Sequence, residues 1–424
     1  MNQTIRKRIE EINNGIVPEG YKKTSFGIFP CDWETDKKLN DLGSFDKGKG
    51  LPGNKMCENG MPCVGYGDIY MKYNYHFEKV YNFVDEETAS ESQPIKKGTI
   101  LFTGTGETAE EIGKCICYNG NETIYVGSDI ILFNSKNVNP LFLAYQQYQG
   151  FSLKRKAMYG QGHSVVHIQR NELRKLNTAF PKDKIEQARI AEILMKWDGM
   201  VELQEQYIQK LELRKKYLFA TLFDFKSDKV TTLQNLIDNG SVRLIKPKEL
   251  PQFEGERIYL STSSIVDNEI VGNEGCISYI KRPSRAQMYP IANSVWFAKM
   301  ENSVKVYKFN KQQQDQYVLS TGYYGLLCNE NKLNSDFLMQ VLLSPEFNKI
   351  KDLFSEGSSQ NGIKDNNLSD LLVYYPKIEK QTRIAKILIR ADEETTLQKE
   401  KLEKIKLQRK VMQQYLLTGI VRVG

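Results

Sequence analysis

The sequence predicts an α+β protein in which two strand-rich mixed domains are separated by two long antiparallel coiled-coil helices, as an internal pseudo-two-fold repeat. The main observation is a duplication: residues 187–222 align without a gap with residues 381–416, and 13 of the 36 aligned pairs are identical. The rest of the chain is dense in Tyr and Phe, in short runs typical of strands. The predicted domains are residues 1–180 (strand-rich), 181–224 (helix), 225–375 (strand-rich) and 376–424 (helix).

The strand-rich domains contain alternating runs such as "TIYVGSDIILF" (residues 123–133) and "NSVWFAKM" (residues 293–300), separated by turn residues. Such runs predict half-buried strands, and helical segments at 140–148 and 336–343 accompany them. Strands and helices do not alternate regularly, so we expect a mixed fold and not a doubly wound parallel sheet.

The duplication extends into these domains at a shift of 195 residues. The matching pairs are Gly162/Gly357, Ser164/Ser359, Ile168/Ile363, Leu173/Leu368, Leu176/Leu371 and Pro181/Pro376. Further upstream the two halves share pattern and not identity. The order of the chain is thus variable domain, similar helix, variable domain, similar helix.

The helical segments have apolar residues at alternating steps of four and three, which is the a/d spacing of a coiled coil. The predicted seam consists of Ile190, Leu194, Trp197, Val201, Ile208, Leu211 and Leu218 in the first copy, and of Ile384, Leu388, Leu402, Ile405 and Met412 in the second. Helices of roughly 36 to 40 residues would be about 55 to 60 Å long. Neither buries its stripe alone, so we expect the two copies to pair, and a chain that returns through a globular domain would pair them antiparallel.

Two polar positions recur in both seams, with Gln204 matching Gln398 and Lys215 matching Arg409. Buried polar residues at seam positions fix the register of coiled coils at some cost in stability. Two interpretations remain open: these residues set the register, or they merely tolerate partial exposure.

Composition and charge narrow the class of protein. The 59 basic and 52 acidic residues give a net charge of +7, which is compatible with a phosphate backbone as partner but does not demand one. The seven Cys residues form no CxxC pair, which argues against a zinc module, and a reducing cytoplasm suits them. No apolar run is long enough to span a membrane, and the charged N-terminus does not resemble a secretory signal.

Two short motifs resemble the sites of amino-methyltransferases. "FTGTG" (residues 102–106) has the pattern of a cofactor loop, and "NPLF" (residues 139–142) resembles the motif that holds the target amino group. The duplication argues against both, because the second copy keeps Asn334 but has Ser335 in place of the proline, and it has no glycine after Phe297. We therefore expect Asn139 to cap a helix. The glycine loop suits contacts with phosphate or bases, or is a plain surface loop.

No catalytic or metal site is evident in the sequence. His163 and His167 are four residues apart, but Ser358 and Gly362 occupy these positions in the second copy, and no carboxylate pair is close in sequence. There is no phosphate-binding glycine motif and no nucleophile triad. We expect a non-catalytic chain without a bound metal.

Four segments together resemble the specificity (S) subunit of type I restriction-modification systems over essentially the whole chain. They are "GYKKTSFGIFPCDWE" (20–34), "ILFTGTGETAEEIGK" (100–114), "FPKDKIEQARIAEIL" (180–194) and "YPKIEKQTRIAKIL" (375–388). The chain departs from the family at Cys31, where an acidic residue is common, and at Gly104, where an Arg is frequent.

The resemblance implies two target-recognition domains, each reading one half of a divided double-stranded DNA site, with the helices as spacer. It further implies two methyltransferase subunits, which hold S-adenosylmethionine and methylate adenine at N6, and motor-nuclease restriction subunits for cleavage. This chain would then direct methylation or cleavage and bind no cofactor itself. Open alternatives are the specificity subunit of a related type II enzyme, a DNA methyltransferase and a scaffold without DNA contact.

Candidate DNA contacts are the polar and basic residues of Gly-rich or basic loops, since these residue types reach phosphates and base edges. In the first half they are Lys47, Lys49, Thr103, Thr105, Lys154, Arg155, Gln161, His163 and Ser164; in the second they are Ser261, Thr262, Lys281, Arg282, Arg285, Ser358, Ser359, Gln360 and Lys364.

Overall fold

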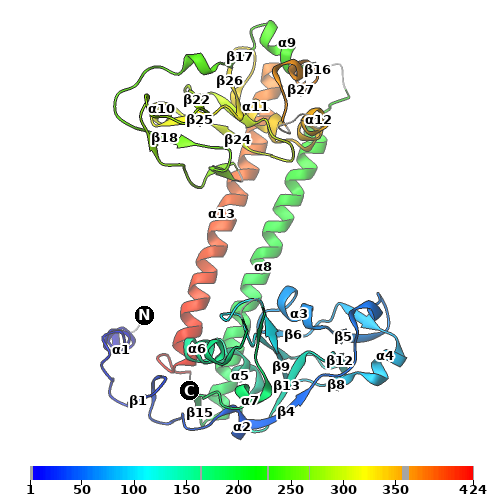
Figure 1. Ribbon diagram of the computed structural model, residues 1–424, viewed down its shortest axis with the longest axis vertical. Helices are drawn as coiled ribbons and strands as arrows, with labels where there is room; N and C mark the ends of the chain where they lie inside the picture. The colour runs from blue at the N-terminus through cyan, green and yellow to red at the C-terminus, as the bar shows by residue number, and fades with distance from the viewer. Residues whose placement is uncertain (1–2, 163–164, 227–228, 267, 356–361, 424) are drawn as a thin grey trace. The chain divides into compact units, whose positions relative to one another are not determined.

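The computed structural model describes residues 3–162, 165–226, 229–266, 268–355 and 362–423, and these form two compact units. Unit 1 comprises Met1–Leu203 and Leu402–Gly424, and unit 2 comprises Gln204–Lys401. Two long helices, α8 (Lys184–Leu222) and α13 (Ile378–Leu417), each contribute to both units (Figure 1). The observed elements confirm the predicted α+β class with its two long helices.

The described residues of unit 1 form a five-stranded sheet, a four-stranded sheet and three short strand pairs. The sheets have the orders β4-β13-β9-β11-β6 and β7-β5-β12-β8. The strands are β1 Tyr21–Thr24, β2 Gly27–Pro30, β3 Trp33–Glu34, β4 Gly43–Lys47, β5 Met61–Val64, β6 His76–Phe77, β7 Asn82–Val84, β8 Gln93–Ile95, β9 Thr99–Thr103, β10 Thr105–Gly106, β11 Cys115–Tyr118, β12 Ile124–Val126, β13 Ile130–Ser135, β14 Val166–His167 and β15 Phe180–Pro181. Its shorter helices are α1 Gln3–Asn13, α2 Leu39–Leu42, η1 Gly53–Lys55, α3 Tyr66–Met71, α4 Glu86–Glu91, α5 Pro140–Gln146, α6 Gly150–Tyr159 and α7 Arg170–Leu173.

Unit 2 repeats this topology with two four-stranded sheets, β17-β26-β23-β24 and β21-β18-β25-β22. Its strands are β16 Val230–Thr232, β17 Val242–Ile245, β18 Arg257–Leu260, β19 Ile265–Val266, β20 Glu269–Ile270, β21 Cys276–Ile277, β22 Ala286–Met288, β23 Val295–Ala298, β24 Val306–Lys308, β25 Tyr317–Ser320, β26 Tyr323–Cys328 and β27 Leu372–Tyr374. Its shorter helices are α9 Leu233–Asp238, η2 Pro247–Glu249, α10 Lys311–Gln314, α11 Ser335–Leu343, α12 Pro345–Ser355 and η3 Asp365–Ser369. Strand by strand, β4, β13, β9 and β11 correspond to β17, β26, β23 and β24.

The helices α5 and α11 start at the predicted caps. The side chain of Asn139 accepts a hydrogen bond from the amide of Phe142 (3.0 Å), and that of Asn334 accepts one from Phe337 (2.8 Å). Pro140 occupies the first helical turn, where the missing amide hydrogen costs nothing. The "NPLF" motif is therefore a helix start, as the duplication predicts.

A glutamine conserved between the two copies ties each long helix to the cap of its unit. The Gln187 side chain accepts from the amide of Asn139 (2.7 Å) and donates to the carbonyl of Pro181 (2.7 Å). Gln381 repeats this arrangement on Asn334 (3.0 Å) and Pro376 (2.8 Å). These fully buried amides satisfy backbone groups that would otherwise lose hydrogen bonds on burial.

The long helices run antiparallel within each unit. In unit 1, Ile190 and Leu194 share one core cluster with Leu416 and Leu417. In unit 2, Phe219 lies in the core cluster that contains Ile384 and Leu388. The predicted seam residues are all buried or half-buried, and the early part of one helix packs on the late part of the other. The antiparallel pairing is confirmed.

The polar seam positions have partners. Gln204 donates to the side-chain oxygen of Gln398 at 3.0 Å in unit 2. Arg409 pairs with Asp198 in unit 1, and Lys215 pairs with Asp392 in unit 2. The two ion pairs are equivalent, since a shift of 194 residues converts one into the other. These contacts support the register interpretation over mere tolerance.

Candidate DNA interface

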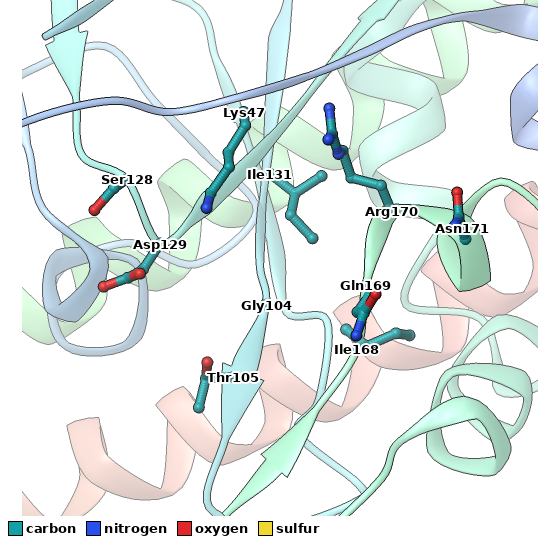
Figure 2. Close-up of a pocket in the computed structure, with 10 residues that line it drawn as sticks. All are labelled: Lys47, Gly104, Thr105, Ser128, Asp129, Ile131, Ile168, Gln169, Arg170 and Asn171. Atoms are coloured by element: carbon teal, nitrogen blue, oxygen red, sulfur yellow. The ribbon is translucent and has the colours of Figure 1, made fainter.

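A pocket of about 350 Å³ in unit 1 gathers residues from four separate segments of the chain. Its lining is mostly polar, and Figure 2 shows these side chains around one opening. The lining residues are Lys47, Gly104, Thr105, Ser128, Asp129, Ile131, Ile168, Gln169, Arg170 and Asn171. Two of the predicted DNA contacts, Lys47 and Thr105, therefore lie in one site.

Sheet register brings these segments together. Lys47 at the end of β4 pairs with Ile131 of β13, and Thr105 of β10 pairs with His167 of β14. The amide of Ile168 donates to the carbonyl of Gly104 (2.9 Å), which joins the glycine loop to the segment before α7. The pocket thus forms where the loop after β9 meets the strand end of β4.

Two tyrosines of α3 hold the glycine loop from behind. The Tyr70 hydroxyl lies 2.7 Å from the carbonyl oxygen of Thr105, and Tyr66 donates to the same oxygen. Burial raises the pKa of both phenols, which keeps them protonated and able to donate. Two hydrogen bonds from α3 therefore hold the loop backbone at Thr105.

The pocket contains two cations and one carboxylate. Lys47 and Arg170 are exposed, and neither makes an ion pair within the described part of the chain. Asp129 also lines the site. A site with two cations that form no ion pair among the described residues, and with several hydroxyl and amide groups, suits a DNA backbone phosphate and the base edges beside it.

The same location can be found in unit 2 from strand register. Phe102 pairs with Ile131, and its equivalent Phe297 pairs with Tyr324. Ile245 pairs with Gly325, so the next residue, Lys246, stands opposite Tyr324 as Lys47 stands opposite Ile131. Tyr324 is therefore the counterpart of Ile131, and Lys246 that of Lys47.

The glycine loop also has a counterpart in unit 2. The amide of Ile363 donates to the carbonyl of Lys299 (3.0 Å), as Ile168 does to Gly104. Lys299 therefore occupies the position of Gly104. Asp365 follows Ile363 by two residues, as Arg170 follows Ile168, so an acidic residue in unit 2 replaces a basic one in unit 1.

The counterpart site in unit 2 has a different chemistry. Tyr324 donates to Asp365 (2.7 Å), and Lys246 lies 3.5 Å from the same carboxylate. The Tyr324 hydrogen bond, followed by the field of Lys246, holds the pKa of Asp365 below its usual value. Lys299 lies 4.1 Å above the Tyr324 ring, and burial lowers its pKa. One scaffold therefore presents two different polar surfaces at equivalent places.

The other predicted contacts are distributed as follows. Lys47, Lys49, Lys154, Gln161, Lys281, Arg285 and Lys364 are exposed, whereas Thr105, Arg155, Ser261, Thr262 and Arg282 are half-buried. His163, Ser164, Ser358, Ser359 and Gln360 lie outside the described residues. Gln161 pairs with His167, next to the Thr105 bridge, so it belongs to the same neighbourhood as the pocket.

One predicted contact serves the fold instead. Thr103 is fully buried, and its hydroxyl bonds Tyr70 (2.9 Å), so we correct its assignment as a DNA contact. Thr103 is the last residue of β9 and faces inward, whereas the sequence suggested that it opens the loop. The Ser261 hydroxyl donates to Glu274 (2.6 Å), and the Arg282 guanidinium lies 4.1 Å above the ring of Tyr279; both residues stay predicted DNA contacts.

The sequence interpretation missed several lining residues, among them Arg170 and Asp129 in unit 1 and Lys246, Lys299 and Tyr324 in unit 2. The one signal in the sequence was position: Arg170 follows the matched Ile168/Ile363 pair by two residues. The others depend on strand register, which the sequence does not reveal.

The described residues offer no group of three or more His, Cys, Asp or Glu side chains arranged to hold a metal ion. In the same part of the chain, no helix has a stretch long and apolar enough to cross a bilayer.

Comparison with known proteins agrees with the two-fold organisation. A family model described as the type I restriction modification DNA specificity domain matches residues 30–213 and again residues 222–407. The putative type I restriction enzyme MjaX specificity subunit of Methanocaldococcus jannaschii is 24% identical over 437 residues, covering 96% of this chain and 97% of the relative. The type I restriction enzyme MjaVIII specificity subunit of the same organism is 22% identical over 441 residues, covering 96% and 98%.

Solved structures share the fold. The S subunit of the type I restriction-modification system from M. genitalium matches with a TM-score of 0.55 at 15% identity, over 95% of this chain and 99% of that one. A chain from a structure on complex assembly and conformational transition of the type I R-M system matches with a TM-score of 0.57 at 14% identity, over 93% and 99%. Nearly the whole chain therefore has the same fold as these proteins.

Proposed function

We propose that the two units of this chain read the two halves of a divided DNA site. The premise is that the chain belongs to the family of type I restriction-modification DNA specificity subunits. The chain is the recognition component, and its relatives carry the same description. Unit 1 reads one half-site through the pocket around Lys47 and Arg170, and unit 2 reads the other through the counterpart site around Lys299.

The observation that supports this proposal is that the two units have sites at equivalent positions, with different polar and charged side chains in each. Strand order and register are the same at both places, but Arg170 in unit 1 is replaced by Asp365 in unit 2, and Gly104 by Lys299. A duplicated catalyst would need the same groups twice. A duplicated reader needs different ones, because different bases present different donors and acceptors.

Exposed leucines at equivalent positions support two copies of a methyltransferase as partners. In unit 1 Leu203 and Leu407 are 67% and 64% exposed, and in unit 2 Leu397 and Leu213 are 60% and 68% exposed. The same two positions of the repeat thus expose leucine in each unit, although most other exposed positions of the helices have diverged. Apolar side chains that stay exposed in both copies suit contact with another protein. We assign one methyltransferase copy to each unit.

The cofactor chemistry belongs to these partners. We propose that they hold S-adenosylmethionine and methylate adenine at N6, that restriction subunits join for cleavage, and that the complex works in the cytoplasm. This chain supplies only the recognition of the DNA sequence.

The test is selection of DNA from a random duplex library by the chain bound to its methyltransferase. The expected result is a motif of two short sequences separated by unread positions. A continuous motif, or no enrichment at all, would contradict the proposal. Transfer of labelled methyl groups to DNA by the chain alone would instead favour the alternative that it is a methyltransferase.

A further inference from the structure

Each unit buries a lysine at the same position of the repeat. Lys156 on α6 and Lys351 on α12 are 195 residues apart, and each is 1% exposed. Burial lowers the pKa of both ammonium groups. Taking an ammonium group out of water is unfavourable by several kcal/mol unless other groups compensate for it. Both diverged copies nevertheless have a lysine at this position. We therefore expect the ammonium group to make an interaction that an apolar side chain cannot make.

In both units the ammonium group binds backbone carbonyls of the same loop. Lys156 donates to the carbonyl of Gly113 (2.8 Å), in the connection between β10 and β11. Lys351 donates to the carbonyls of Met300 (2.8 Å) and Ser303 (2.9 Å), in the connection between β23 and β24. Since β9 and β11 correspond to β23 and β24, residues 104–114 and 299–305 are one loop in two copies.

These loops begin at the candidate DNA sites. Gly104 and Thr105 line the pocket of unit 1, and Lys299 opens the counterpart loop of unit 2. In unit 1 the loop is fixed at both ends, by Tyr70 on the carbonyl of Thr105 and by Lys156 on that of Gly113.

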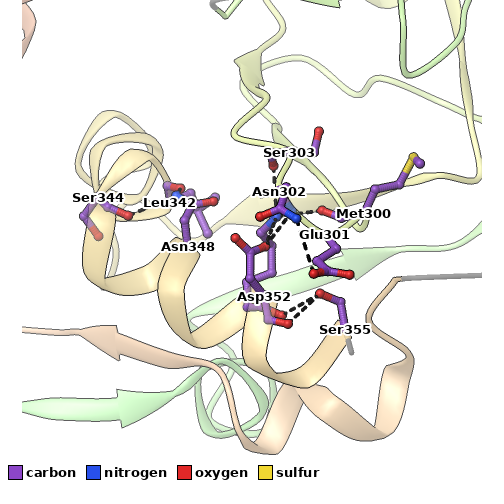
Figure 3. Close-up of polar contacts among 10 residues, drawn as sticks. Met300, Glu301, Asn302, Ser303, Leu342, Ser344, Asn348, Asp352 and Ser355 are labelled. Carbon is purple, nitrogen blue, oxygen red and sulfur yellow. Dashed lines mark hydrogen bonds and ion pairs between the residues drawn. The ribbon is translucent and has the colours of Figure 1, made fainter. Parts of the chain in front are cut away.

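The loop backbones come close to these anchors. Gly113 has a φ of +66°, and a Cβ there would lie 3.0 Å from the Cδ of Lys156, so the loop is packed against the lysine stem. In unit 2, Asn302 has a φ of +53°, and its amide donates to Asp352 at 3.1 Å (Figure 3). Asp352 also lies 3.0 Å from the Lys351 ammonium, so α12 holds the turn by two adjacent side chains.

We propose that Lys156 and Lys351 are positioning residues that hold the two DNA-facing loops in their reading conformation, each for its own half-site. The inference rests on the proposed function, since it assigns a role to these loops in reading DNA. Neither ammonium touches DNA. Each acts through the loop carbonyls, which no apolar side chain of the same length can bind.

The experiment uses Lys156→Met and Lys351→Met in the full complex with the methyltransferase, on the two-part site that the wild-type complex selects. Methionine keeps the apolar stem and removes the donors. For each variant, affinity is measured for the selected duplex and for duplexes with base changes in one half-site. We expect Lys351→Met to reduce discrimination at one half-site by about tenfold or more, the scale of a lost base contact, and Lys156→Met to do so only at the other.

Hydrogen exchange separates positioning from a general loss of fold. Amides of residues 299–305 should exchange faster in Lys351→Met, while β23 and β26 remain protected as in the wild type. Asp352→Ala, which frees the Asn302 amide and leaves Lys351 in place, is the second variant if Lys351→Met does not fold. It should weaken discrimination at the same half-site.

Three results overturn the inference. One is that a folded Lys351→Met complex discriminates between the selected duplex and the base-changed duplexes as the wild type does. If Lys351→Met does not fold, the same result in Asp352→Ala counts in its place. Another is equal loss at both half-sites. In either case the proposed function survives, because the wild-type complex still selects a two-part site. If the wild-type complex selects no such site, the proposed function fails and the positioning role fails with it.

Discussion

The two equivalent ion pairs of the long helices predict unequal losses of stability on the same substitution. Arg409 is 9% exposed; its guanidinium contacts Asp198 (2.5 Å) and the hydroxyl of Tyr75 (2.9 Å), and it lies 4.0 Å above the Tyr75 ring. In its counterpart, the side chains of Lys215 and Asp392 are 21% and 37% exposed.

Arg409→Met removes the cationic partner of a buried pair and leaves the Asp198 carboxylate with the Tyr145 hydroxyl and, at 3.7 Å, His76. Loss of one partner of a buried pair costs about 3 to 5 kcal/mol in comparable sites. The new methionine recovers part of this by packing, so we expect a loss of about 3 kcal/mol from the free energy of unfolding. Lys215→Met breaks a half-exposed pair and should cost about 1 kcal/mol or less.

Urea unfolding followed by tryptophan fluorescence measures both. Trp33 and Trp197 lie in unit 1 and Trp296 in unit 2, so Trp296→Phe leaves a signal from unit 1 for Arg409→Met, and Trp33→Phe with Trp197→Phe leaves a signal from unit 2 for Lys215→Met. Equal losses of unfolding free energy in the two variants, or a larger loss in Lys215→Met, would refute the argument that burial decides how much each ion pair contributes to stability.

Two further predictions concern DNA. Replacing both Lys47 and Arg170 with Ala should lower the magnitude of the slope of log affinity against log salt by about two, because each phosphate contact contributes about 0.9. The control Lys196→Ala, on an exposed face of α8, should leave the slope unchanged. An unchanged slope in the double variant would show that the pocket does not contact phosphate. Inserting seven residues in both helices, after Leu203 and after Lys401, preserves the heptad phase and adds about 10 Å of helix. The methylated half-sites should then be the same but lie about three base pairs further apart at 3.4 Å each, and an unchanged gap in an active complex would mean that the helices are not the spacer.

The architecture could be predicted from the sequence because it is encoded locally and twice. Asn139 and Asn334 cap equivalent helices, and one copy lacks the proline, which identified the motif as a helix start. The heptad seam depends only on spacing along one helix. Pairing followed because neither stripe can be buried alone, and its antiparallel direction followed because the chain returns through a domain between the two helices.

The candidate site could be predicted only in part, because it depends on register between distant strands. Lys47 and Thr105 were found by residue type, but Lys299 and Tyr324 belong to the site only through the pairing of β23 with β26. Thr103 was misassigned because nothing in "LFTGTG" marks where the strand ends and the exposed loop begins.

The central claim is that two independent readers share one chain, and exchange of one reader tests it most directly. Residues 1–180 would be replaced by the corresponding segment of another family member, and the adenine methylation pattern of a host carrying the hybrid and its methyltransferase would be sequenced. We predict that one half of the methylated site changes while the other half stays the same. A change in both halves, or a site that does not change at all, would contradict the account.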